Sequence, residues 1–191
     1  TTTVAGFLCD LSSGEVLATE AMMNPQIEFG EDVMTRITYA QQHANGLAEM
    51  NRAIIQGLNT LAQNAALQVG LTPLDIVEAV LVGNTAMHHI LLGLDILPLG
   101  RSPFTPSLHH SVNVKARDLR LEFLPSANVH VLPIEAGFVG ADNVGVLIAE
   151  EPYNQDEIRL IIDIGTNGEL ILGNRERLVS ASCATGPAFE G

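Results

Sequence analysis

The sequence contains little cysteine and few basic residues, and both shortages narrow the range of functions. Cys9 and Cys183 are the only cysteines among its 191 residues. Two are too few for a disulfide framework, and this number fits the reducing environment of the cytoplasm. Nine lysine and arginine residues oppose 22 aspartate and glutamate residues, which gives a formal net charge of −13. Because a phosphate backbone or an anionic membrane attracts a basic surface, we expect neither nucleic acid nor a membrane as the main partner.

Long apolar runs and an N-terminal targeting signal are also missing. The most apolar stretch, Val77 to Leu99, is interrupted by charged and polar side chains, whereas a membrane span needs about 20 mostly apolar residues. The chain opens Thr-Thr-Thr-Val without a basic segment, so we expect no signal peptide and a cytoplasmic location. Hydrophobic residues nevertheless make up 47% of the sequence, which is enough for a core and excludes intrinsic disorder.

Apolar periodicity predicts a chain in which strands alternate with helices. From Gly46 to Val69, apolar residues recur at three- and four-residue steps, as on one helix face, and Gly70 is placed to end that helix. The run Ile76 to Val82 predicts a buried, parallel strand, and a helix is expected after it over 85–92. Further helices are expected at 31–39 and 137–149, and further strands at 3–10, 15–21, 113–123, 129–132, 159–164, 169–172 and 178–183. This order is typical of the α/β class.

An internal repeat divides the chain. The strand, turn and small-residue strand after Thr166 resemble the segment after Thr1, once a difference of about three residues in turn length is allowed. The acidic segment Glu150 to Glu157 lies between the two copies. We therefore predict a first lobe over residues 1–152, with a peripheral insertion near 97–127, and the start of a second lobe over 153–191. The first copy lacks the apolar strand and the Asp-x-Gly of the second, so we expect the sequence to be part of a longer protein.

The segment IIDIGTNGEL carries the clearest chemical signal. As local structure alone, Asn167-Gly168 between apolar runs predicts a type I′ hairpin in which Asp163 caps the turn. The functional interpretation is a phosphate loop, in which Gly165 and Gly168 let successive N–H groups approach an anion and Thr166 adds a donor. Asp163 would repel a bare phosphate, so it fits a site where Mg²⁺ lies between them, held through metal-bound water. Spacing alone favours neither interpretation.

Two such hairpins facing each other, the first represented here only by Thr1-Thr2-Thr3, resemble the phosphate loops of the actin, heat-shock chaperone and sugar kinase superfamily. Within that superfamily, five segments along nearly the whole chain resemble the ATPase domain of the reductive activators of corrinoid proteins: VLVGNTAMHHILLGLD, SPFTP, IEAGFVGAD, IDIGTNGEL and CATGPAFEG. The strings GNTAMHH and GPAFEG are much more specific than DIGT alone.

The resemblance implies an RNase H-like lobe with a mixed sheet and flanking helices, followed by the first strands of a second such lobe. In that family, ATP use drives an electron from a plant-type 2Fe–2S domain to an inactive Co(II) corrinoid, giving Co(I) on a methyl-transfer protein. ATP and Mg²⁺ are the implied cofactors, a corrinoid protein of a methyltransferase system is the implied partner, and a homodimer is expected. The cluster would lie outside this chain, since two cysteines cannot supply four thiolates.

The resemblance also implies roles for individual residues. Asp163 would be catalytic and hold Mg²⁺ through water, and Glu135 would be catalytic by orienting the attacking water or Mg²⁺. Contacts to the nucleotide would come from three segments: Thr1, Thr2 and Thr3; Gly83, Asn84 and Thr85; and Gly165, Thr166, Asn167 and Gly168. Without the resemblance, the second of these is an ordinary strand-to-helix turn with an Asn cap. Glu135 would then be a solvated loop carboxylate.

Two other functions stay open at this point. A small-molecule kinase on the same fold would need a general base near Asn84, and the sequence offers no Asp there. A non-catalytic domain for dimerisation or docking would need no phosphate site at all.

The remaining chemical groups favour structural roles. His88-His89 is expected to serve packing or a protein contact rather than metal binding, because adjacent helix residues point in different directions. Cys183 is expected to be a buried, inert thiol. Three glycines at positions 137, 140 and 145 predict close packing of the helix expected at 137–149 against a neighbouring helix, with a frayed, partly irregular helix as the alternative.

Overall fold

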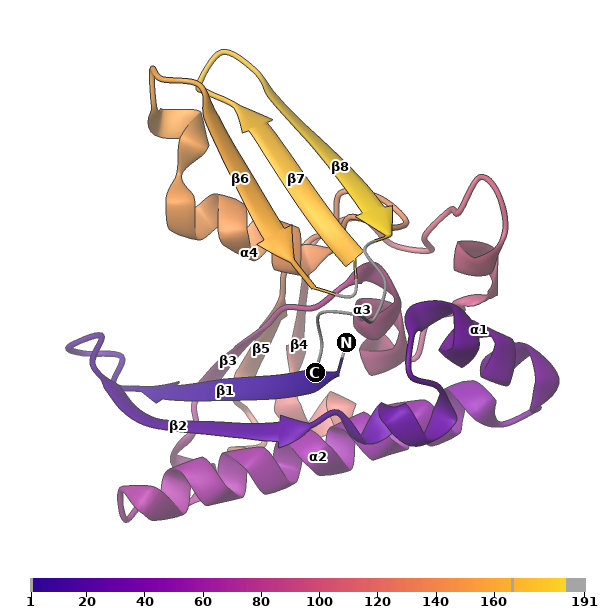
Figure 1. Cartoon of the computed structure of the whole chain (residues 1–191). Coiled ribbons are helices and arrows are strands. Elements are labelled where there is room, and N and C mark those ends of the chain that lie inside the picture. The colour runs from indigo at the N-terminus through magenta and orange to yellow at the C-terminus, as the bar shows by residue number, and fades with distance from the viewer. Residues whose placement is uncertain (1, 166, 185–191) are drawn as a thin grey trace.

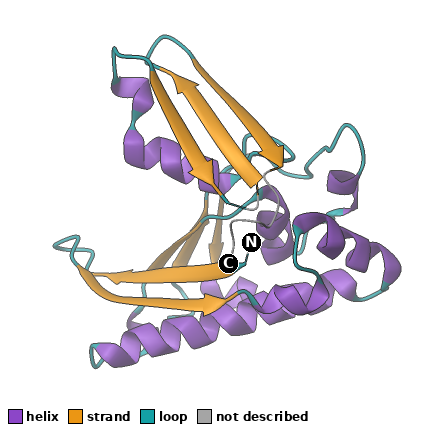
Figure 2. Cartoon of the chain, in the orientation of Figure 1, coloured by secondary structure: helices purple, strands orange, loops and turns teal. Residues whose placement is uncertain are grey.

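Three small β-sheets and four α-helices make up the part of the chain that the structure, a computed structural model, describes, namely residues 2–165 and 167–184 (Figures 1 and 2). The sheets follow one another along the chain, with a two-stranded sheet first and a three-stranded antiparallel sheet last. Strands and helices alternate between them, which confirms the α/β class. None of the helices in this described part is long and apolar enough to cross a membrane.

The first sheet is an antiparallel hairpin of β1 (Thr3–Cys9) and β2 (Val16–Met23), which lies along the long helix α2 (Gly46–Gln68) (Figure 1). A glycine on each side permits the close approach. A Cβ on Gly6 would collide with the side chain of Leu61, and one on Gly57 would lie 2.5 Å from Met22 Cε. The helix ends where the sequence predicts, with Gly70 at a φ of +72°.

The second sheet has the order β3-β5-β4 and mixes strand directions. β3 (Glu78–Leu81) is parallel to β5 (Asn128–Val131), and β4 (Val112–Lys115) is antiparallel to β5. Val129 and Val131 belong to a core cluster with residues of α2 and of α3 (Thr85–Leu92). The segment 113–123 supplies only β4, because a 3₁₀ helix follows at Ala116–Leu119.

The prediction of a buried strand at 76–82 is only half right. The strand is parallel, but the side chains of Val80 and Val82 are 58% and 56% exposed. Alternation explains the difference, since Ala79 and Leu81 pack on the core while their neighbours point to the opposite face. Within the described residues, that opposite face is not covered at Val80.

A second core cluster joins α1 (Val33–Gln42) to α2 and α3. Ile37, Met50, Ile90 and Ile96 are almost completely buried there. The helix α3 begins and ends as predicted: the Asn84 side chain accepts a hydrogen bond from the Met87 N–H (3.0 Å), and Gly93 is left-handed with a φ of +68°.

The third sheet consists of β6 (Arg159–Ile164), β7 (Asn167–Gly173) and β8 (Leu178–Ala184), and α4 (Ala141–Glu150) runs beside it in Figure 1. Two predictions are corrected here. The helix begins at Ala141 instead of 137, because residues 137–140 form a loop that contacts other segments. Asn167-Gly168 begins β7 and does not form the centre of the turn.

The thiol of Cys183 is exposed, which contradicts the expected buried position. Strand register gives the reason. Cys183 pairs with Gly168, which pairs with Ile164, and the Ile164 side chain on this row is 70% exposed. The row therefore lies on the sheet face that no other described element covers.

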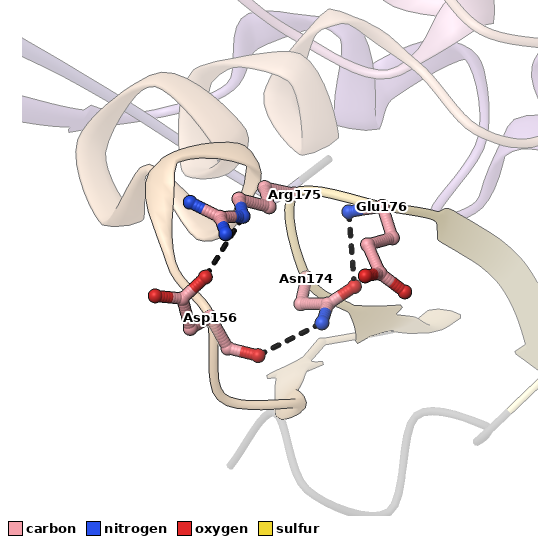
Figure 3. Close-up of polar contacts among 4 residues, drawn as sticks. All are labelled: Asp156, Asn174, Arg175 and Glu176. Carbon is pink, nitrogen blue, oxygen red and sulfur yellow. Dashed lines mark hydrogen bonds and ion pairs between the residues drawn. The ribbon is translucent and has the colours of Figure 1, made fainter.

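The acidic boundary segment, residues 150–157, is bonded to the turn between β7 and β8 through Asp156 (Figure 3). Asp156 forms an ion pair with Arg175 (2.8 Å), and the Asn174 side-chain amide donates to the Asp156 carbonyl (2.8 Å). Asn174 also accepts the Glu176 N–H at 3.1 Å. Because the paired side chains of Asp156 and Arg175 are largely exposed, the ion pair stabilises this turn by no more than about 1 kcal/mol.

Candidate functional site

Two helices begin side by side at the centre of the candidate site. Gly140, the N-cap of α4, lies directly against the backbone of Asn84, the N-cap of α3, and a Cβ on Gly140 would lie 2.5 Å from Asn84 Cα. The N–H groups of Ala141 and Asp142 donate to the Gly83 carbonyl at 2.9 and 3.3 Å. Helix N-termini carry partial positive charge, which favours an anion nearby. In the first turn of α4, however, the N–H groups of Ala141 and Asp142 are already bonded to Gly83, so an anion would be bound mainly by the start of α3.

A side-chain contact fixes the same junction from the other direction. The Thr85 hydroxyl donates to the Ala136 carbonyl (2.7 Å), and Thr85 itself is buried. Gly137 lies so close to the carbonyl of Phe104 that any Cβ would collide with it. The prediction of close packing is therefore right for Gly137 and Gly140, but the predicted helix-to-helix contact is wrong, because both glycines lie in a loop and contact a loop and a helix start. Gly145 meets only Val82, at an ordinary 3.7 Å.

Carboxylates gather on the hairpin beside these helix starts. Asp163 at the end of β6 pairs across the sheet with Glu169, and Glu169 accepts a hydrogen bond from the Ser182 hydroxyl at 3.1 Å. Burial raises the pKa of Glu169, and the charges of Asp142 and Asp163 raise it further. Burial likewise raises the pKa of Asp142, with the charge of Asp163 adding to it. The three carboxylates are therefore close enough to repel one another.

Of these three, only Asp163 is expected from the sequence. Asp142 lies in the first turn of α4, and Glu169 is the third residue of the NGEL string. The signal for both was visible, since an Asp follows Gly140-Ala141 and a Glu follows Gly168. Asp142 and Glu169, however, come close to Asp163 only because α4 packs beside the third sheet, and no local sequence pattern specifies that packing.

Glu135 lies at the same junction but is held by two other side chains. Its Oε1 accepts a hydrogen bond from the Asn143 amide (2.7 Å) and its Oε2 accepts one from the Ser180 hydroxyl. Asn143 is on α4 and Ser180 is on β8, so this carboxylate connects the two elements. Its expected role in orienting water stays a prediction.

The segment expected to be a phosphate loop, and the first threonines, are only partly described. Thr1 and Thr166 lie outside the described residues. Gly165 follows β6 directly, Asn167 and Gly168 begin β7, and Gly168 accepts a hydrogen bond from the Cys183 thiol at 3.4 Å.

The start of β1 is linked to α3 through one residue. The Thr2 carbonyl accepts the Asn24 N–H (2.7 Å), and the Asn24 amide reaches the sulfur of Met87 on α3 at 3.7 Å. Thr3 is the first residue of β1. Thr2 and Thr3 therefore lie near the helix start that Asn84 caps.

The histidine pair is buried behind the site. Both ring nitrogens of His89 are engaged, Nδ1 with the Thr85 carbonyl (2.8 Å) and Nε2 with the Ser107 N–H (2.9 Å). Because Nε2 accepts, Nδ1 carries the proton. Burial, and then the neighbouring His89, lowers the pKa of His88 to about 4. The two rings thus act as neutral packing and hydrogen-bonding groups at neutral pH.

Sequence comparison assigns the chain to a class and then to a family. Residues 157–191 match the C-terminal domain of RACo, the ASKHA domain, and residues 1–155 match the RACo middle region. The chain therefore belongs to the RACo family. This confirms the resemblance to reductive activators of corrinoid proteins.

Named relatives agree with this assignment. The chain is 37% identical over its whole length to "Corrinoid activation enzyme RamQ" of Eubacterium limosum, and 25% identical over 96% of its length to "[Co(II) methylated amine-specific corrinoid protein] reductase" of Methanosarcina barkeri. A solved structure, "Reductive activator for corrinoid,iron-sulfur protein", covers the whole chain with 38% identity and a TM-score of 0.96. The chain spans about a third of the length of each of these proteins, namely 32%, 34% and 30%.

Proposed function

We propose that this chain is part of an ATP-dependent reductive activator that returns an inactive Co(II) corrinoid protein to Co(I). The electron would come from an iron–sulfur domain outside the chain. One observation carries the proposal: α4 begins against Asn84, and Asp142 in the first turn of α4 interacts electrostatically with Asp163 of the hairpin. The names of the relatives supply the corrinoid partner and the reductive chemistry.

Backbone groups would bind the phosphates. None of the residues proposed above for the nucleotide site is a lysine, and the whole sequence carries a net charge of −13. Binding of a polyphosphate must then rely on backbone N–H groups of the hairpin and of the start of α3, which are fixed partial positive charges. The Asp163 hairpin and the segment at Thr2-Thr3 would hold the nucleotide from two sides.

The carboxylates fit a hydrated magnesium ion. Within residues 2–165 and 167–184, no three His, Cys, Asp or Glu side chains are close enough to ligate one ion directly. Mg²⁺ commonly keeps several waters and takes one or two carboxylates, so Asp163, with Asp142 and Glu169 nearby, suits that mode of binding. When bound, Mg²⁺ would neutralise phosphate charge and polarise the terminal phosphoryl group. The mutual repulsion of the three carboxylates supports a cation site here.

We further propose that residues 1–152 form one RNase H-like lobe, with a peripheral insertion near 97–127, and that 153–191 begin a second. Hydrolysis of ATP to ADP and phosphate would be coupled to closure of the two lobes about the nucleotide. Closure would favour the conformation in which the corrinoid protein accepts one electron from the cluster, so that Co(II) becomes Co(I). A homodimer in the cytoplasm is part of the same proposal.

The test is ATP hydrolysis by the parent protein and by its Asp163→Asn variant, measured over a range of Mg²⁺ concentrations. Asp163→Asn should lower kcat at least about 100-fold, because it removes the charge that holds the ion. Glu157→Gln is the matched control, since it removes an equal charge from the exposed boundary segment, and it should leave the rate unchanged. Normal hydrolysis by Asp163→Asn would contradict the proposal. Phosphoryl transfer to a small acceptor would favour a kinase, and no nucleotide binding would favour a docking domain.

A further inference from the structure

We propose that Glu135 is a positioning residue, whose carboxylate ties α4 to β8 and thereby holds Asp142 against the Asp163 hairpin. It replaces the direct role in orienting water that the family resemblance implies for Glu135. The inference rests on the proposed function for its link to ATP, but the contacts that carry it are independent of the nucleotide.

A continuous series of hydrogen bonds runs from the third sheet to Asp142. The Ser180 hydroxyl donates to Glu135 Oε2, and the Asn143 amide donates to Glu135 Oε1 at 2.7 Å. The Asn143 N–H in turn donates to Asp142 Oδ1 at 3.0 Å. Each oxygen of Glu135 thus already accepts a hydrogen bond from the protein.

The buried Asn143 side chain depends on Glu135 for its orientation. Its side chain is almost completely buried, with the residue 1% exposed, and its Oδ1 has no hydrogen-bond donor within the described part of the chain. A reversed amide would place that oxygen against the Glu135 carboxylate, so the bond to Glu135 fixes the observed orientation. Removal of Glu135 would remove the one hydrogen bond that this buried amide makes within the described part of the chain.

The backbone of Glu135 is fixed as well. The N–H groups of Glu135 and Ala136 both donate to the Val139 carbonyl, at 3.0 and 2.9 Å, and the Ile134 N–H donates to the His109 carbonyl at 3.1 Å. A side chain on such a closed loop can hold its partners in place. It is well suited to a structural connection between two elements.

Strand register relates the connection to the proposed magnesium site. Ser180 pairs with Ile171, and two residues further along β8 Ser182 pairs with Glu169, which pairs with Asp163. Two residues along a strand separate side chains on one face by about 7 Å. Glu135 therefore contacts the sheet at Ser180, on the same face as Asp163 and about 7 Å along the strand direction from the row of Asp163, Glu169 and Ser182.

The connection also joins two separately matched parts of the chain. Glu135 and Asn143 belong to the part that matches the RACo middle region, and Ser180 belongs to the part that matches the C-terminal domain. Of the two side-chain hydrogen bonds of Glu135, only the one to Ser180 crosses between these parts. A relative movement of the parts would therefore strain that bond.

Glutamine distinguishes positioning from proton transfer. In Glu135→Gln, the side-chain oxygen can still accept from Asn143, and its NH₂ group can donate to the Ser180 hydroxyl, which rotates to accept. Glutamine cannot act as a base. We expect kcat for ATP hydrolysis by the parent protein to fall less than about threefold in Glu135→Gln, with an unchanged pH profile, and about tenfold or more in Glu135→Ala. A Glu135→Gln variant as slow as Glu135→Ala, with the acidic limb of the pH profile lost, would overturn the proposal.

Ser180→Ala provides a second variant with little risk to folding, because this hydroxyl is on an exposed position of β8. It should show part of the loss, and the double variant Glu135→Ala/Ser180→Ala should be no slower than Glu135→Ala alone. Additive losses would contradict a shared connection.

Hydrogen exchange separates this proposal from the proposed function. The amides of the first turn of α4, Asp142 and Asn143 included, should exchange faster in Glu135→Ala than in wild type and Glu135→Gln. If the parent protein hydrolyses no ATP, the proposed function fails, while this exchange difference still tests the connection. Equal exchange in all three proteins would refute it.

Discussion

Replacement of Gly140 by alanine tests the junction of the two helix starts. The new Cβ would lie 2.5 Å from Asn84 Cα, 2.6 Å from the Thr85 nitrogen and 2.8 Å from the Asn84 carbonyl carbon. All three are backbone atoms, which cannot rotate away as a side chain can. The backbone of Gly140 is itself extended, with φ −96° and ψ −167°, so alanine can adopt it and most of the cost arises from the collision. Alanine is also a poorer N-cap than glycine, which adds to the loss.

The expected loss is at the upper end of the range for overpacking, about 3 kcal/mol of unfolding free energy. For a chain of this size, that loss lowers Tm by roughly 6–12 °C. Thermal and urea unfolding of the 191-residue chain, followed by circular dichroism, measure it directly. Because the junction must separate to admit the methyl group, nucleotide binding by the parent protein should weaken as well.

Gly145→Ala is the matched control, since it makes the same chemical change one and a half turns further along. Its Cβ would lie 3.7 Å from Val82 Cγ1, an ordinary contact. Alanine inside a helix is favoured over glycine by about 1 kcal/mol, so this variant should be slightly more stable than wild type. If Gly140→Ala unfolds with the same midpoint as Gly145→Ala, the close contact between α4 and Asn84 is wrong.

Two further predictions concern buried polar groups. The buried Asn51 amide donates to the carbonyls of Ile90 and Leu91, both at 2.9 Å, so Asn51→Ala should cost about 2–3 kcal/mol in urea unfolding. Asn59 also makes two hydrogen bonds, but it is only half-buried and both bonds are solvent-exposed, so Asn59→Ala should cost less than about 1 kcal/mol. Equal losses would contradict the burial of Asn51. Burial lowers the pKa of His88 to about 4, so the unfolded chain takes up a proton near pH 6.5 that the folded chain takes up only near pH 4. Stability should therefore fall as the pH drops through this window, by up to about 1.4 kcal/mol per pH unit, and His88→Gln should remove that part of the slope. Identical slopes in both proteins would refute a buried neutral His88.

Local signals in the sequence specify much of the fold. The three- and four-residue apolar spacing locates α2, and Asn84 and Gly93 locate both ends of α3, because caps act through bonds to residues a few positions away. The hairpin β6–β7 follows from apolar runs around a glycine-rich turn. In each of these elements, the structure is determined by contacts that the neighbouring residues themselves make.

Properties that depend on distant partners are harder to predict. The exposure of Val80 and of Cys183 depends on whether another element covers their sheet face, and no pattern within a strand records that. The helix α4 begins late because Gly140 must contact Asn84, which lies 56 residues earlier. Asp142 joins the site for the same reason.

In the proposed function, ATP hydrolysis at the Asp163 hairpin drives the reduction of a corrinoid protein. The most direct measurement is the conversion of Co(II) to Co(I) corrinoid protein, followed by absorption spectroscopy, with the reduced parent protein and its Asp163→Asn variant. We expect the wild type to form Co(I) with ATP. With a non-hydrolysable ATP analogue, its Co(I) formation should stay at the level seen without nucleotide. The variant should stay at that level even with ATP. Equal formation of Co(I) by both proteins, with or without ATP, would contradict the claim.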